Sequence, residues 1–263
     1  MKAKARSMIS RQDRILEALQ SSGLVTVDGL CEMLQISIAT VRRDLQDLED
    51  RALLRRARGG AVPIGPLFYE PFRHDTSFQE KVSSFAEEKR RIARAAARLV
   101  RPGDTIALSG GTTTTEVARG FMSIEGLTII TNTINVAMEL SACKGIEVIV
   151  TGGCLRGNWF TLVGPLANLA AQMIYADIMF LGVDGIAATL GLSCTNSQEA
   201  EYLRIMAQHA KRKVVVTDHS KIGVQSKWML CPAREITTLI TDTGASDKSI
   251  SPFEQMGIEV IRV

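Results

Sequence analysis

The chain has 263 residues, of which 46% are hydrophobic and 22% are charged, as in ordinary soluble globular proteins. No apolar run approaches the ~20 residues that a membrane-spanning helix needs. The basic start lacks the apolar stretch of a secretory signal, so we expect a cytoplasmic protein. The five cysteines are scattered, without the paired spacing of a zinc or redox site, and we expect no metal and no cofactor.

The net charge of +3 comes from the beginning of the chain. Residues 1–62 hold 11 Lys and Arg against 8 Asp and Glu, whereas the remainder holds 20 of each sign. A modest basic excess does not identify a partner. The positions of the arginines within the predicted elements must therefore indicate the partner.

Apolar spacing predicts three short helices in the first 50 residues, at 12–19, 28–34 and 38–48. Thr26 or Val27 is expected near the cap of the second helix, and Ser37 at the cap of the third. Two short helices joined by a tight turn form a helix-turn-helix.

The third helix has an apolar face and a polar one. The apolar face carries Ile38, Val41, Leu45 and Leu48. Thr40, Arg42 and Arg43 lie largely off that face and project outward near the helix start, as the recognition helix of such a domain requires.

A hairpin follows, in which Gly59-Gly60 turns between two short strands. Its arginines Arg55, Arg56 and Arg58 could contact phosphates or enter a minor groove, because a guanidinium is always charged and donates bidentately. The alternative is a solvated charged face on a small helical domain.

Composition predicts two domains. Residues 1–62 form the helical head, and the Pro- and Gly-containing stretch after it begins a connector over 63–86. In residues 87–263, short apolar runs alternate with helical patterns, which predicts an α/β domain with a largely parallel sheet. The expected strands are 106–108, 127–130, 148–150, 178–181, 214–216, 239–241 and 258–263.

Polar or glycine-rich loops follow five of these strands and would share one rim of a parallel sheet, where ligands bind. The first, 109–115, joins a strand to a helix start, which favours an anion. Its alternative is an ordinary strand-to-helix turn with threonine caps. The candidate ligand-binding residues are Gly110, Gly111, Thr112, Thr113, Thr114, Asn132, Gly152, Gly153, Asp184 and Lys221. Asp184 could accept sugar hydroxyls or be a structural cap, and Lys221 would pair with phosphate.

The stretch Ile36–Leu45 (ISIATVRRDL) and the stretch Arg56–Ala61 (RARGGA) resemble the DeoR family of bacterial transcription regulators. The resemblance implies that Ser37, Thr40, Arg42 and Arg43 contact DNA. Arg58 departs from the family, which commonly has His before Gly-Gly. This departure affects which bases the wing would contact, and it does not affect the expectation that the domain binds DNA.

The resemblance extends through the second domain, on motifs such as Gly111–Thr114 and Asp218–Lys221. It implies a winged helix-turn-helix followed by an α/β sensor domain that is similar to ribose-5-phosphate isomerase and binds phosphorylated sugars. Gly111–Thr114 would hold the phosphate, with Asp184 and Lys221 near the sugar. Ser109 and Leu203 stand where many members carry Asp and Lys, so no effector identity is carried over.

We therefore predict a repressor of a carbohydrate-metabolism operon that binds double-stranded DNA as a homo-oligomer and responds to a phosphorylated sugar. The alternative is a sugar-phosphate isomerase-like enzyme, for which Asp184, Glu199, Asp218 and Lys221 are chemically capable groups. An enzyme needs no arginine-rich head, so regulation is favoured. Features of an RNA-binding protein are not found.

Overall fold

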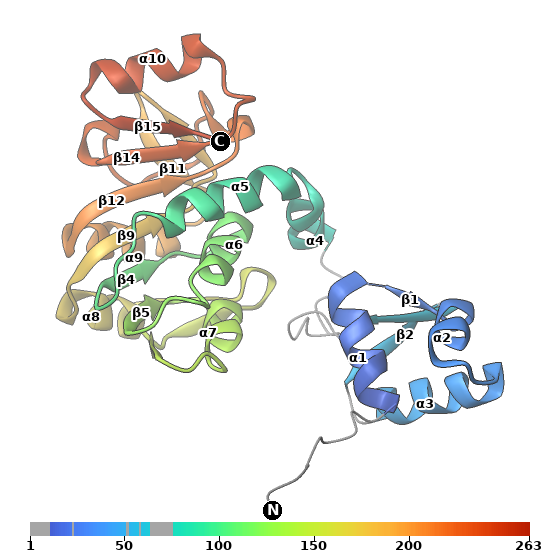
Figure 1. The fold of residues 1–263 in the computed structure, drawn as a ribbon. Coiled ribbons are helices and arrows are strands. Elements are labelled where there is room, and N and C mark those ends of the chain that lie inside the picture. Colours follow the sequence, from blue (N-terminus) through green and yellow to red (C-terminus); the bar gives the residue numbers. More distant parts are fainter. Residues whose placement is uncertain (1–10, 23, 51–52, 58, 64–75) are drawn as a thin grey trace, which may run out of the picture. The chain divides into compact units, whose positions relative to one another are not determined.

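The computed structural model describes residues 11–22, 24–50, 53–57, 59–63 and 76–263 (Figure 1). The chain divides into two compact units, residues 1–68 and residues 69–263. Each unit has its own hydrophobic core. Among the described residues, no helix is long and apolar enough to span a bilayer.

The first unit is a winged helix-turn-helix, as predicted. Its strands pair antiparallel in the order β1-β3-β2, so the β2–β3 hairpin forms the wing. The elements are α1 (Arg11–Ser22), β1 (Val25–Thr26), α2 (Val27–Leu34), α3 (Ile38–Asp50), β2 (Leu54–Ala57) and β3 (Gly60–Pro63).

Local hydrogen bonds set the ends of the two helices of the helix-turn-helix. The Thr26 hydroxyl accepts a hydrogen bond from the Gly29 N–H at 3.1 Å and caps α2. The Ser37 hydroxyl accepts one from the Thr40 N–H at 3.3 Å at the start of α3. Between them, Gln35 turns the chain in the left-handed region, with φ 56°. The buried face of α3 then packs against α1.

The wing packs closely on β1 because residue 60 is glycine. A Cβ atom at Gly60 would lie 2.0 Å from the Val25 carbonyl oxygen. Since two heavy atoms cannot approach so closely, any side chain here would force β3 away from β1.

The second unit is built on a seven-stranded sheet with the order β15-β14-β12-β9-β4-β5-β6. Every pairing in this sheet is parallel, which confirms the predicted sheet type. The strands are β4 (Thr105–Leu108), β5 (Leu127–Thr131), β6 (Ile146–Val150), β9 (Ala176–Leu181), β12 (Ala210–Val216), β14 (Thr238–Thr241) and β15 (Glu259–Arg262).

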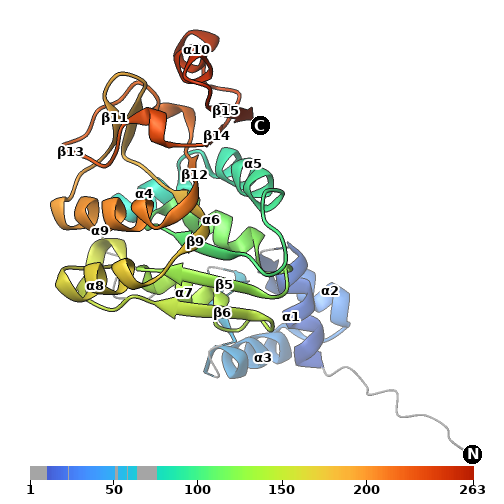
Figure 2. The same ribbon diagram turned by 90° about the vertical axis from the view of Figure 1, so that its left-hand side faces the viewer.

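Helices cover both faces of the sheet (Figure 1 and Figure 2). In β4, Ile106 and Leu108 join one core and Ala107 joins the other, as the twofold period of a strand requires. One face is covered by α5 (Ala86–Ala97), α6 (Thr112–Gly120) and α7 (Ile134–Leu140). The other is covered by α8 (Pro165–Met173), α9 (Ser197–Gln208) and α10 (Asp247–Gln255).

Smaller elements surround one rim of the sheet. Helix α4 (Thr76–Ser83) precedes α5 and lies within the stretch that the sequence suggests is a connector. A hairpin of β7 (Cys154–Arg156) and β8 (Thr161–Val163) carries the short helix η2 (Gly157–Trp159). A second small sheet consists of β10 (Gly185–Ala187), β11 (Gly191–Cys194) and β13 (Trp228–Met229). The short helices η3 (His219–Lys221) and η4 (Ala233–Glu235) complete the unit.

Candidate functional site

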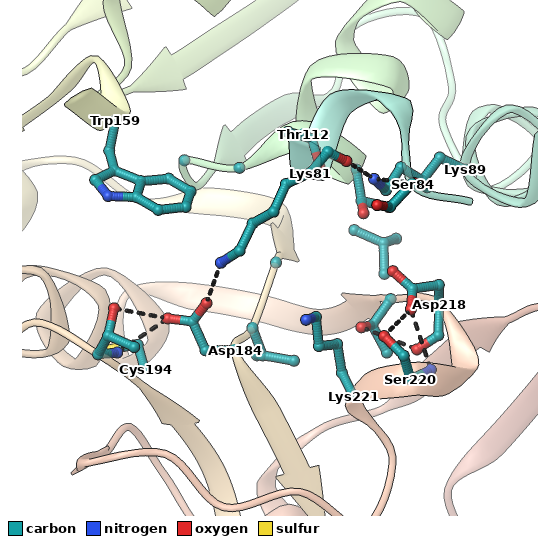
Figure 3. A pocket seen from close by; sticks show the side chains of 18 of the residues that line it. Lys81, Ser84, Lys89, Thr112, Trp159, Asp184, Cys194, Asp218, Ser220 and Lys221 are labelled. Carbon is teal, nitrogen blue, oxygen red and sulfur yellow. Dashed lines mark hydrogen bonds and ion pairs between the residues drawn. The ribbon is translucent and has the colours of Figure 1, made fainter. Parts of the chain in front are cut away.

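A cavity of about 200 Å³ opens at the carboxyl ends of three neighbouring strands, β12, β9 and β4. The loops after these strands supply its floor, because β9 pairs with both of the others. Helix α4, the start of α5 and η2 supply further walls (Figure 3). The site therefore lies where open α/β sheets bind ligands.

One wall of the cavity is the N-terminus of α6. Gly111 precedes the helix with φ 132° and ψ 163°, a conformation that L side chains rarely adopt. The hydroxyls of Thr114 and Thr115 both donate to the Gly111 carbonyl, at 3.0 and 2.8 Å. The first N–H groups of a helix have no acceptor within it, so this end, with Thr112 and Thr113 beside it, can receive an anion.

Three lysines line the cavity: Lys81 from α4, Lys89 from α5 and Lys221 from η3. Lys89 is buried, and its ammonium donates to the carbonyls of Lys81 and Ser84. Burial lowers the pKa of Lys89, while the nearby Asp218 acts in the opposite direction. A buried ammonium attracts an anion more strongly than an exposed one does.

Three carboxylates line the same cavity, and each has a hydrogen-bond donor. Asp184 accepts from Lys81 at 3.2 Å and from the N–H and hydroxyl of Thr195 at 2.9 and 3.0 Å. Glu199 accepts from Arg156 at 2.6 Å, and Asp218 accepts from the Ser220 N–H at 3.0 Å. Burial raises the pKa of Glu199, and Arg156 counteracts this.

The remaining walls are less polar. The cavity is also lined by Phe85, Trp159, Val183 and Leu203. Leu203 is buried, and it stands at the position where the resemblance to the DeoR family leads one to expect Lys. Burial raises the pKa of the Cys194 thiol to about 11. This thiol is therefore protonated near neutral pH and is not a ready nucleophile.

Six of the predicted ligand-binding residues line the cavity together: Gly110, Gly111, Thr112, Thr113, Asp184 and Lys221. The other four, Thr114, Asn132, Gly152 and Gly153, do not line it. Thr114 and Asn132 are fully buried, and the Asn132 amide donates to the Leu162 carbonyl at 3.0 Å.

Strand order explains this division. The loops that carry Asn132 and Gly152 follow β5 and β6, which lie beyond β4 at one side of the sheet. Parallel strands do place all five loops at one rim, but the cavity is centred on β9 and reaches only the loops of its two neighbours, β12 and β4, whereas β5 and β6 lie on the far side of β4. Ser109, at the end of β4, ties two of the cavity loops together, since its hydroxyl accepts from the Gly182 N–H at 2.9 Å.

Several cavity residues were not singled out from the sequence: Lys81, Trp159, Thr161 and Thr195. They come from the connector, from η2 and the β8 hairpin, and from loops whose place in space depends on tertiary structure. For Lys89 the sequence does offer a signal, because the pair Glu88-Lys89 also resembles the DeoR family.

The predicted DNA-contacting residues lie at the start of α3 and on the wing. Arg42 and Arg43 are exposed on α3, and the Ser37 and Thr40 hydroxyls hydrogen-bond to each other at 2.9 Å. Arg56 is exposed on β2, its N–H donates to Glu49 at 2.8 Å, and its guanidinium contacts Gln46. Arg58 and the side chain of Arg55 lie outside the described part of the chain.

A groove of about 300 Å³ in this unit is lined by α2, α3 and the wing, and Arg42 and Arg56 are among its lining residues. Arg11 of α1 holds α3 in place through a bidentate ion pair with Asp44. Its Nε and Nη2 atoms lie 2.5 and 2.7 Å from the two carboxylate oxygens. Asp44 is buried, so the pair points one face of α3 inward and leaves Arg42 and Arg43 outside.

Among the described residues, no group of three His, Cys, Asp or Glu side chains is placed to hold a metal ion. A winged helix with outward arginines, joined to an α/β domain with a polar cavity, defines a DNA-binding regulator with a ligand-binding domain.

Comparison with known proteins identifies the family. Residues 11–65 match the DeoR-like helix-turn-helix domain, and residues 84–243 match the DeoR C terminal sensor domain. The HTH-type transcriptional regulator GolR of Listeria innocua is 34% identical over 250 residues, 95% of this chain and 96% of that protein. The putative aga operon transcriptional repressor of Escherichia coli O157:H7 is 34% identical over 255 residues, 96% and 93% of the two chains. The chain belongs to the DeoR family and is a DNA-binding transcriptional regulator.

Among solved structures, ribose 5-phosphate isomerase A from Methanocaldococcus jannaschii is similar with 19% identity and a TM-score of 0.38. The match covers 52% of this chain and 55% of that one.

Proposed function

We propose that the protein represses a carbohydrate-metabolism operon and that a phosphorylated sugar, bound in the cavity of the second unit, weakens its hold on DNA. The observation that carries the proposal is the pairing of two chemistries in one cavity. The α6 N-terminus with Lys89 and Lys221 suits a phosphate, and Asp184 and Glu199 suit hydroxyl groups. The name of the aga operon repressor supports the choice of a repressor.

A thermal-shift series on the intact protein tests this effector class. Ribose 5-phosphate, glucose 6-phosphate and fructose 6-phosphate are compared with the free sugars and with inorganic phosphate. A bound effector at a hundredfold excess over its Kd stabilises the folded state by about 2.7 kcal/mol. At least one sugar phosphate should raise the melting temperature more than its free sugar does. Stabilisation by free sugars alone would contradict the proposal.

We infer that the cavity senses its ligand and does not convert it. An isomerase needs a carboxylate that is available to take a carbon-bound proton. Here Asp184, Glu199 and Asp218 are each engaged by hydrogen-bond donors, and the arginine-bearing head serves regulation. Turnover of ribose 5-phosphate by the purified protein would contradict this inference. The proposal places the protein in the cytoplasm with its DNA and requires no cofactor.

We also propose that the protein works as a homo-oligomer, since one recognition helix alone gives a small interface with DNA. The exposed apolar stripe on α8 supports this, because Leu166, Leu169 and Met173 are 68%, 54% and 74% exposed. Sedimentation of the Leu169→Glu variant tests it. The variant should sediment as a smaller species than the parent protein, and an unchanged oligomer would exclude α8 from the interface.

A further inference from the structure

The side chain of Lys81 extends from α4 across the cavity toward Asp184 (Figure 3). Its ammonium lies 3.2 Å from a carboxylate oxygen of Asp184 and 4.4 Å from the centre of the Trp159 ring. A molecule that fills the cavity and hydrogen-bonds to Asp184 must therefore contact Lys81 or displace it.

The end of helix α4 is held to the rest of the unit by polar contacts from Lys89. Lys89 donates to the carbonyls of Lys81 and Ser84, where the last carbonyls of a helix have no partner within it. Phe85 then turns the chain with φ 53°. Its ring packs edge-on against the His219 ring, with 4.8 Å between the two ring centroids. Helix α4 also contacts α6, whose N-terminus forms the anion-binding wall.

The position of α4 in the chain makes these contacts relevant to DNA binding. It is the first described element after the wing strand β3, and residues 64–75 connect the two. Helix α4 is therefore the part of the second unit that follows, in sequence, the stretch of chain leading from the DNA-binding unit.

We propose that Lys81 is the residue through which α4 detects the occupant of the cavity. The proposal rests on the function proposed above. In the structure the Lys81 ammonium pairs with Asp184. A phosphorylated sugar donates its hydroxyls to Asp184 and offers phosphate oxygens to Lys81, so the lysine exchanges one anionic partner for another. Helix α4 moves with it, and DNA affinity changes.

The Lys81–Asp184 pair is well suited to such an exchange. The two side chains are 39% and 27% exposed, and ion pairs with this much solvent contact contribute little to stability. Replacement of Lys81 should therefore leave the protein folded, and a loss of response counts as a loss of signalling where the effector concentration saturates the variant in the thermal-shift assay.

The first test measures DNA affinity with and without each sugar phosphate of the thermal-shift panel. In the parent protein, a stabilising sugar phosphate should weaken DNA binding about tenfold or more. Lys81→Met should still be stabilised by that compound while its DNA affinity changes less than about twofold. Lys81→Arg should restore the response, and the control Lys248→Met, exposed on α10, should respond fully. A full response in Lys81→Met overturns the proposal.

The second test needs no effector. Hydrogen exchange of the peptide covering α4 is measured in the parent, in Lys81→Met, in Asp184→Asn and in the double variant. Each single variant should speed exchange about threefold or more, and the double variant should exchange about as fast as Lys81→Met, because both substitutions disrupt the same Lys81–Asp184 pair. Unchanged exchange in Lys81→Met overturns the proposal. If no compound of the panel affects the parent protein, the proposed effector class fails, and exchange still decides the role of Lys81.

Discussion

Lys89 places a positive charge in a poorly solvated part of the cavity. Its ammonium donates to the backbone carbonyls of Lys81 and Ser84, which are neutral, and within the described ranges of the chain it forms no close ion pair with a carboxylate. Burial lowers the pKa of Lys89 because the charged form loses hydration. An incoming phosphate would add negative charge beside this lysine, which favours an anion over a neutral sugar as the proposed effector.

Thr112 offers a test of the anion site at the scale of one residue. It is the first residue of α6 and lines the cavity. In Thr112→Glu, a carboxylate should occupy the phosphate position and repel the ligand. We expect affinity for the stabilising sugar phosphate to fall about tenfold or more, equivalent to about 1.4 kcal/mol.

The matched control is Thr112→Gln, which has the same shape without the charge. Calorimetric titration of both variants should show a much smaller loss for the glutamine. Equal losses in the two variants would mean that side-chain size, and not charge, governs the site.

At this scale the sequence predicts residues that belong to a local motif. Gly110–Thr113 could be found because a strand, a glycine turn and a helix start are adjacent in the chain. Lys81 and Trp159 could not, since they reach the cavity from α4 and η2, which have no polar motif of their own. Thr114 shows the converse limit, because its hydroxyl turns back to the Gly111 carbonyl instead of facing the cavity.

Among the elements, strand order determines which loops meet. Hydrophobic runs predict the seven strands and their parallel sense, because buried strands alternate with helical patterns. They do not predict that β9 lies between β4 and β12. This order brings Asp184 and Lys221 to the α6 N-terminus and leaves Gly152 and Gly153 outside the cavity. The order of the strands in the sheet depends on packing between segments that are distant in sequence.

The wing gives a prediction at the scale of an element. Gly60→Ala places a methyl group against the Val25 carbonyl, so β3 must move away from β1. Overpacking of this kind costs about 1–3 kcal/mol. Denaturant unfolding of the variant should show that loss in the first unit, together with weaker DNA binding.

The control for the wing is Gly59→Asn. Gly59 has φ +81° and open space around its Cβ position, and Asn tolerates the left-handed region. This variant should lose much less stability than Gly60→Ala. If both glycine variants unfold alike, the close approach of β3 to β1 is not what requires glycine at residue 60.

In the whole molecule, DNA binding and the proposed effector binding belong to two units with separate hydrophobic cores. The first unit presents Arg42 and Arg43 on a helix that Arg11 and Asp44 fix in place. The second unit carries the proposed effector site, and α4 follows the connecting residues 64–75. Ligand and DNA are linked thermodynamically, so a sugar phosphate that weakens DNA binding must itself bind less tightly to the DNA-bound protein.

The most direct measurement is the affinity for DNA from upstream of the protein's own gene, with and without the sugar phosphate that stabilises it most. We predict that this compound weakens binding about tenfold or more in the parent protein. Thr112→Glu should bind the DNA normally and not respond. Arg43→Ala should bind DNA weakly yet still be stabilised by the sugar phosphate. A Thr112→Glu variant that responds like the parent, or a parent that binds this DNA no better than unrelated DNA, would contradict the account.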